Sequence, residues 1–133
     1  MALKSQAATR AALDGMNALA NGGTLVLYSG AVPGTADAAA GTTIVTINLE
    51  ATAFSSATGT TTATASLSIG GGKSGTTVAA LDPDYYRILS SGAVPVHQGT
   101  AGAGGDLDFD VDTGWELGAT VTVTSLTVSL PVA

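Results

Sequence analysis

The sequence predicts a mainly β protein: a single antiparallel β-sandwich of jelly-roll-like form with one short N-terminal α-helix. Short β-prone runs separated by turn residues recur at intervals of about 8 to 15 residues, which is the spacing typical of sandwich strands. The chain is 45% hydrophobic but only 5% aromatic and has 18 glycines, so small side chains suited to pleated surfaces and turns dominate. No helical pattern alternates with the strands after residue 23, which disfavours a parallel α/β sheet.

The length of the chain predicts one domain. Chains of 133 residues bury roughly two thirds of the surface that they expose when unfolded, which is enough for a real core but not for two independent domains. We expect residues 1–22 to form an N-terminal arm and helix, and residues 23–133 to form the sandwich.

An amphipathic helix is predicted between Ser5 and Asn21, because apolar residues recur there at spacings of three and four. Asn21, Gly22 and Gly23 can take the left-handed conformation that ends a helix. The predicted apolar stripe consists of Ala8, Ala12, Leu13, Met16, Leu19 and Ala20.

The strands are predicted where β-prone residues alternate with polar ones. The clearest alternation has two inward-facing sets, Val45, Ile47 and Leu49 in the second strand and Ala63, Ala65, Leu67 and Ile69 in the third. The expected strands are Thr24–Tyr28, Thr43–Leu49, Thr60–Ile69, Thr76–Ala80, Tyr85–Leu89, Val94–Gln98, Leu107–Val111 and Thr120–Leu130.

The last of these strands changes phase along its length. Val121 and Val123 share one parity, whereas Leu126, Val128 and Leu130 share the other. Successive side chains of a strand point to opposite faces, so one extra residue near Thr124 and Ser125 would return the apolar set to the core side. We therefore predict a β-bulge at that point in a long framework strand.

Charge and cysteine content exclude several classes of function. The net charge is −6 and the only cations besides the single histidine are Lys4, Arg10, Lys73 and Arg87, too few to neutralise a nucleic-acid backbone. The absence of cysteine removes disulfides and thiolate chemistry. No stretch approaches the roughly 20 apolar residues of a membrane span, and the N-terminus lacks the apolar run of a secretory signal, so we expect a protein that is made in the cytoplasm.

A glycine-rich run at Gly70–Gly75, GlyGlyGlyLysSerGly, superficially suggests a phosphate-binding loop. The first glycine of that motif would fall at Leu67, and the residues after Ser74 are typical of a strand rather than of the helix that should hold the anion. A flexible hairpin loop is the preferred interpretation.

Four aspartates, at positions 106, 108, 110 and 112, alternate with apolar residues, so a strand would place them on one face about 7 Å apart. Solvated carboxylates are the default for such a pattern. A calcium site formed by Asp108, Asp110 and Asp112 remains an alternative, although the glycine and glutamate of an EF-hand loop are not at their required positions.

The sequence does not assemble a catalytic group, so we expect no enzymatic activity and no cofactor. His97 is the only histidine, and no serine lies in a nucleophile elbow. Glu50 and Glu116 are isolated in sequence, which neither supports nor excludes a carboxylate pair.

The few aromatic residues are interpreted as core and interface anchors rather than as a sugar-stacking platform. Alternation sends Tyr85 and Tyr86 to opposite faces of their strand, so we expect one to be buried and the other exposed. The interface candidates are Leu13, Met16, Tyr85 and Trp115.

Several motifs together resemble a known family. After the Ala- and Leu-rich helix they are GlyThrLeuValLeuTyrSerGlyAlaValPro at Gly23–Pro33, TyrTyrArgIleLeuSerSerGly at Tyr85–Gly92, HisGlnGlyThrAla at His97–Ala101, GlyGlyAspLeuAspPhe at Gly104–Phe109, and the terminal strand at Gly118–Pro131. The chain resembles, over most of its length, small structural proteins of tailed bacteriophages. The shared motifs are turns and strand faces, not catalytic groups.

The resemblance implies a virion component with a β-sandwich fold that assembles in several copies on a head, neck or tail surface. The expected role is a capsid decoration or cement protein that binds the major capsid protein or other virion proteins, with a homotrimer as the favoured oligomer. A head-tail joining, collar or tail accessory protein is the first alternative. A carbohydrate-binding or adhesion module is the second, and it would give a calcium-dependent rise in melting temperature.

Overall fold

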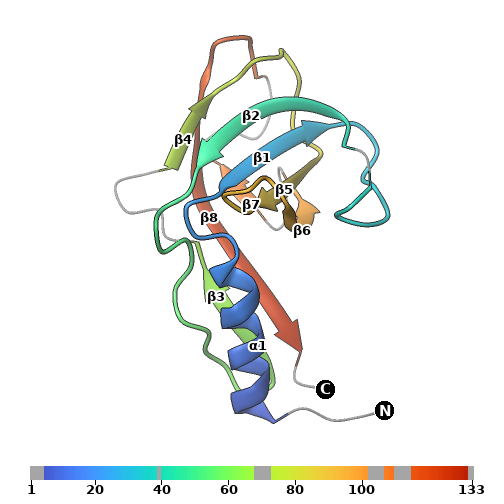
Figure 1. The fold of residues 1–133 in the computed structure, drawn as a ribbon. Coiled ribbons are helices and arrows are strands. Elements are labelled where there is room, and N and C mark those ends of the chain that lie inside the picture. Colours follow the sequence, from blue (N-terminus) through green and yellow to red (C-terminus); the bar gives the residue numbers. More distant parts are fainter. Residues whose placement is uncertain (1–4, 39, 68–72, 102–106, 110–114, 132–133) are drawn as a thin grey trace.

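One helix and eight strands make up the computed structural model, which describes residues 5–38, 40–67, 73–101, 107–109 and 115–131 (Figure 1). The elements in chain order are α1 (Gln6–Ala18), β1 (Thr24–Ser29), β2 (Thr42–Asn48), β3 (Thr62–Ser66), β4 (Lys73–Thr76), β5 (Tyr85–Leu89), β6 (Pro95–Thr100), β7 (Leu107–Phe109) and β8 (Thr120–Pro131).

The strands form two antiparallel sheets. In the first sheet the order is β2-β1-β5-β6, and in the second β8 pairs with β3, β4 and β7. Side chains from both sheets meet in one hydrophobic cluster, to which Leu27 and Ile88 contribute from one side and Val123 and Leu126 from the other. The predicted mainly β sandwich with one helix is confirmed.

Strand β8 holds the second sheet together. Its first residues pair with β4, its last residues pair with β3, and β7 pairs with its middle. The predicted bulge is present: Asp108 pairs with Ser125 and Phe109 with Val123, so Thr124 has no counterpart in β7. Thr124 and Ser125 are exposed, whereas the apolar residues on both sides of them face the core.

The two sheets also approach each other at their edges. Next to β4, the amide of Val78 donates to the carbonyl of Ile44 in β2 at 2.7 Å. Gly75 lies so close to β2 that a Cβ atom there would be 2.8 Å from Val45 Cγ1. At the opposite edge, Ala101 and Leu107 form a parallel bridge. Short contacts of this kind leave less strand edge open to unwanted pairing.

Helix α1 packs against β3 and β8, and its N-terminus is capped by Ser5, whose Oγ accepts from the amide of Ala8 at 3.1 Å. Its buried face differs from the predicted stripe, because the buried helical residues are Thr9, Leu13 and Asn17. Of the residues in the predicted stripe, Leu13 and Ala20 are buried, Met16 is half-buried, and Ala8, Ala12 and Leu19 are exposed.

The predicted stripe is only partly buried because two polar residues, Thr9 and Asn17, lie on the buried face of the helix. Thr9 is tolerated there since its hydroxyl donates to the carbonyl of Ser5 at 2.9 Å within the same helix. A prediction that ranks the helix positions by hydrophobicity alone therefore places the buried face at the wrong angle around the helix axis.

Most strand predictions are confirmed. Tyr85–Leu89 has the predicted bounds, and the inward-facing residues Val45, Ile47, Leu49, Ala63, Ala65 and Leu67 are all buried, whereas Ile69 lies outside the described residues. The prediction of a strand at Thr76–Ala80 was wrong, because β4 ends at Thr76. Thr77 leaves the sheet to bond the turn before β8: its hydroxyl donates to the carbonyl of Glu116 and accepts from the amide of Ala119.

Candidate functional site

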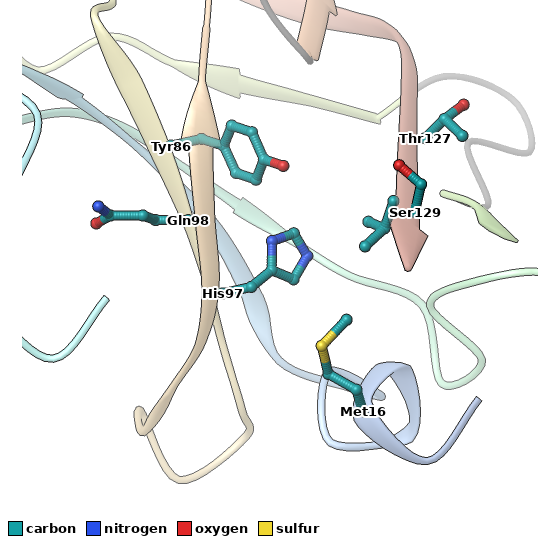
Figure 2. Close-up of a pocket in the computed structure, with 7 residues that line it drawn as sticks. Met16, Tyr86, His97, Gln98, Thr127 and Ser129 are labelled. Carbon is teal, nitrogen blue, oxygen red and sulfur yellow. The ribbon is translucent and has the colours of Figure 1, made fainter. Parts of the chain in front are cut away.

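A cavity of about 260 Å³ opens between the two sheets where β5 and β6 face the last residues of β8. Figure 2 shows Met16, Tyr86 and His97 directed toward this space, whereas Gln98, the next residue along β6, points away from it. The lining residues are Met16, Tyr86, His97, Gln98, Thr127, Val128 and Ser129.

The chemistry of this cavity is limited. Among the described residues that line it are one imidazole and one phenol, and none of these lining residues carries a carboxylate. The ring of His97 meets the ring of Tyr86 edge-on, with centroids 5.6 Å apart, and it lies 6.4 Å from the ring of Phe54. Within the described residues no group of three or more His, Cys, Asp or Glu side chains could hold a metal ion. The contacts that the structure shows for the His97 ring are therefore with the rings of Tyr86 and Phe54.

A second cavity, of about 320 Å³, lies between α1 and the segment 49–61, which runs beside the helix in Figure 1. The lining residues are Asp14, Asn17, Ala18, Asn21, Thr52, Phe54, Ser55 and Ser56. One side chain of α1 and one of the turn after it fix the facing segment, since Asp14 Oδ1 accepts from the amide of Ala57 at 2.7 Å and Asn21 Oδ1 accepts from the amide of Ala53 at 2.9 Å.

Asn17 is the unusual residue of this second cavity. Its side chain is only 4% exposed, yet neither Nδ2 nor Oδ1 has a hydrogen-bond partner among the described residues. Sequence reasoning missed Asn17 because a polar residue in an amphipathic helix is assigned to the solvent face by default. Its spacing of four and eight residues from Leu13 and Thr9 is the signal that places it on the buried face.

Arg87 forms a third polar cluster, on the outer face of the first sheet. Its side chain is 4% exposed, its Nε donates to Gln98 Oε1 at 3.0 Å, and its Nη2 donates to the carbonyl of Thr35 at 3.3 Å. The guanidinium lies 5.9 Å from the ring centroid of Tyr28 and 6.0 Å from that of Tyr85, and these rings stack at 5.1 Å. Burial raises the pKa of the Tyr28 phenol, and the charge of Arg87 partly opposes that rise.

This cluster holds the loop residues Pro33, Thr35 and Gly41 over the sheet. Gln98 Nε2 donates to the carbonyl of Pro33 at 2.6 Å, and the hydroxyl oxygen of Tyr85 accepts from the amide of Gly41 at 2.6 Å. As a result Tyr85 is buried on the outer face, while Tyr86, on the opposite face as predicted, is buried in the core between the sheets. The expectation that one of them is exposed was wrong because a loop, not solvent, covers the outer face.

The four residues predicted as interface candidates expose little surface to solvent. Leu13 and Tyr85 are fully buried, Trp115 is 6% exposed with its ring edge-on to Phe109, and Met16 is half-buried beside the first cavity. All six aromatic residues of the chain are buried: Tyr28, Phe54, Tyr85, Tyr86, Phe109 and Trp115. Exposed large apolar side chains occur instead at Leu19, Val32, Val78, Leu81, Val94 and Leu117.

The structure tests one of the two charged motifs, the glycine-rich run that contains Lys73, but not the aspartate run. Lys73 belongs to strand β4 rather than to a loop, and its Nζ lies 2.6 Å from Glu50 Oε1. An ion-paired lysine on a strand is not the lysine of a phosphate loop. Of the aspartate run, Asp110 and Asp112 lie outside the described residues and only the backbone of Asp108 is described, so the calcium site stays a prediction.

No protein-family model matches the chain, and neither curated proteins nor solved structures gave a significant match. In the part of the chain that the structure describes, α1 is the one α-helix, and its 13 residues are too few to cross a membrane.

Proposed function

We propose that this chain is a structural protein of a tailed-bacteriophage virion, and specifically a decoration or cement protein that binds the capsid surface as a homotrimer. The observation that carries the proposal is where the motifs of the resemblance lie. They fall on β1, β5, β6, β7 and β8 and on the turns between them, rather than on a cluster of reactive side chains. A chain whose shared residues build a rigid framework fits a role in which shape and contact surface matter.

A contact surface for such a role lies at one end of the sandwich. The amide of Thr77 donates to the carbonyl of Ala119, and the amide of Gly118 donates to the carbonyl of Thr77, so the chain after β4 runs beside the turn before β8. Three large apolar side chains are exposed on these two segments: Val78 at 66%, Leu81 at 40% and Leu117 at 69%. We call these three residues the apolar end.

Val78 and Leu117 adjoin the residues that these backbone bonds join, and exposed apolar side chains on neighbouring segments support an interaction site. A protein that repeats on a lattice needs only a small contact per copy, because multivalent binding multiplies weak contacts. The apolar end is therefore assigned to the contact with the shell or with a neighbouring copy.

The carbohydrate-binding alternative is disfavoured as a stacking module. Sugar recognition by stacking needs an aromatic ring at the surface, and all six aromatic residues of this chain are buried.

The test is reconstitution with phage heads that lack the chain. Purified protein is added to heads from a deletion phage, and both co-sedimentation and the temperature of DNA release are measured. The proposal predicts saturable binding and a higher release temperature. Protein that stays in the supernatant at every concentration would contradict it, and binding to tails alone would favour the neck or tail role.

Matched variants locate the contact surface. Leu117→Ser should weaken head binding without loss of folding, because the side chain is 69% exposed and contributes little to the core. Val94→Ser, at a residue 61% exposed in the turn between β5 and β6, is the control and should bind like the wild type. Equal binding by both variants would remove the apolar end from the proposal.

A further inference from the structure

The last part of β8, residues 127–131, pairs with a described strand on one side only. Strands β3 and β7 flank β8 on opposite sides, because Leu126 accepts from the amide of Leu67, directly after β3, and also pairs with Leu107 of β7. Strand β7 begins at Leu107 and continues away from residues 127–131. On the β7 side, none of the strands that the structure describes pairs with these last residues, whereas β3 pairs with them on the other side. We call the unpaired side the open edge of β8.

The bonds of β3 show which main-chain groups of β8 point to the open edge. Thr64 and Ser66 both make their main-chain hydrogen bonds with the segment 55–58, which lies on the side of β3 away from β8. Their partners in β8 are Ser129 and Thr127. The residues of such a pair do not bond each other, so the N–H and C=O groups of both point outward from the ladder. The main-chain groups of Thr127 and Ser129, two exposed residues, therefore point to the open edge.

The first cavity, of about 260 Å³, lies beside the open edge. Residues 127–129 line it from β8, and His97 lines it from β6 across the space (Figure 2). Further along β8, strand β7 lies between these two strands: it pairs with β8, and its Leu107 bridges Ala101, directly after β6. A single strand fits between them there, so the cavity is a place for one further extended chain next to β8.

The surroundings of the open edge define the chemistry of such a chain. Met16, Tyr86 and His97 are directed into the cavity, and none of its described lining residues is an acid, a lysine or an arginine, so side chains that enter it should be apolar. On the other face of β8 the exposed Thr127 and Ser129 allow polar neighbours. The net charge of the protein is −6, which favours basic residues at the ends of the bound segment and disfavours acidic ones.

A second copy of this chain is not the occupant that the geometry favours. Its β8 would bring the paired β3 with it, whereas the space between β8 and β6 takes one strand where β7 occupies it. An edge of five residues is also short for a stable dimer, which needs about 800 Å² from each partner.

We infer that the open edge of β8 binds a single extended segment of another polypeptide by strand addition, with alternate apolar side chains of that segment in the first cavity. The orientation is antiparallel, as in every described pairing of β8. Thr127 and Ser129 each exchange main-chain bonds with the segment, which gives affinity, and the cavity selects the side chains. The apolar end precedes β8 and the open edge lies on its last residues, so this site does not rest on the proposed virion role.

The test is a nuclear magnetic resonance titration of the ¹⁵N-labelled full chain with the synthetic peptide acetyl-KTVTVTK-amide at millimolar concentration. Its valines suit the cavity, its threonines fall opposite Thr127 and Ser129, and its ends are basic. The amide signals of Thr127 and Ser129 should shift saturably. Those of Val128 and Leu130, whose main-chain groups face β3, should shift less.

A matched peptide separates strand addition from unspecific contact. The same peptide with its central threonine N-methylated lacks one main-chain donor and cannot approach the edge closely, so it should bind about tenfold more weakly or not at all. Equal binding of the two peptides would overturn the inference. So would a titration in which neither Thr127 nor Ser129 shifts, or a shift of these amides with protein concentration alone, which would place a second copy at the edge.

A variant tests the same edge from the side of the protein. Ser129→Pro removes the N–H that points to the open edge, a position at which an edge strand tolerates proline, so the chain should fold and lose peptide binding. Ser129→Thr keeps the N–H and is the control, with binding like the wild type. A folded Ser129→Pro chain that binds the peptide as tightly as the wild type would contradict the inference. The comparison of the two peptides uses the wild-type chain, so it decides the matter even if this variant does not fold.

Discussion

Deletion of Thr124 is the most informative change to the fold. This residue is the bulge that lets both halves of β8 keep their apolar side chains on the core side. Without it, a continuous strand can keep only one half of its apolar residues on the core side. If the second half keeps its place, Val121 and Val123, now 3% and 1% exposed, turn to solvent. Moving two such side chains out of the core costs about 3 to 6 kcal/mol, at about 1.5 to 3 kcal/mol each.

The loss should exceed that of the two side chains alone. The same residues pair with β4, so turning them outward also disturbs the ladder between Lys73 and Thr76. A small domain has a total stability of about 5 to 15 kcal/mol, so the deletion variant should be unfolded or close to it. Urea unfolding followed by the fluorescence of Trp115, the single and buried tryptophan, measures the effect.

The control is Thr124→Ser, which keeps the length of β8 at an exposed position and should change the free energy of unfolding by less than about 0.5 kcal/mol. A deletion variant that unfolds within about 1 kcal/mol of the wild type would refute the role given to the bulge.

Three further predictions concern other parts of the chain. Gly75→Ala should destabilise the protein by about 1 to 3 kcal/mol in urea unfolding, because the new Cβ would be 2.8 Å from Val45 Cγ1 and 2.9 Å from the carbonyl oxygen of Thr46. Gly15→Ala, in the helix with nothing within 4 Å, should instead stabilise by about 0.5 to 1 kcal/mol, and equal effects at the two sites would contradict the close approach of the sheets. The pKa of Tyr28 is raised above 10.0 in the folded state, so the stability that depends on its neutral phenol is fully present below pH 10.0 and is lost as the pH rises through the folded value. Tyr28→Phe should therefore make unfolding less dependent on alkaline pH, and an unchanged dependence would show that other groups control it. Adding calcium or EDTA should leave the melting temperature unchanged, and a calcium-dependent rise would instead indicate a cation site in the acidic run 108–112.

Patterns along a single strand could be predicted from the sequence because they depend on local alternation alone. The phase change around Thr124 requires only that side chains alternate and that one face stays buried, and the pairing of β7 with β8 has the expected extra residue. The burial of Val45, Ile47 and Leu49 follows from the same rule, and it holds although neighbouring Ile44 is buried as well.

Features that depend on contacts between distant segments could not be predicted in this way. Tyr85 is buried by a loop that Arg87 and Gln98 hold in place, and those bonds reach back more than fifty residues, to Thr35 and Pro33. No local pattern contains that information.

The buried face of α1 and the residues of the second cavity could not be predicted from the sequence for a related reason. Thr9 satisfies its hydroxyl within the helix, and Asn17 is buried with no side-chain hydrogen bond to any of the described residues, so neither follows the rule that polar residues face solvent. The strand predicted at Thr76–Ala80 failed because the bonds of Thr77 to the turn before β8 end the sheet early. In each case the tertiary contact, rather than the propensity of the segment, decided the outcome.

The copy number of the chain in purified virions tests the central claim most directly. Under the proposed function, quantitative mass spectrometry of the phage particles gives the ratio of this chain to the major capsid protein. A decoration protein is predicted to be present at a ratio comparable with that of the capsid protein itself, since it repeats with the lattice. A few copies per particle would contradict the decoration role in favour of the neck or tail, and absence from the particle would contradict the virion proposal altogether.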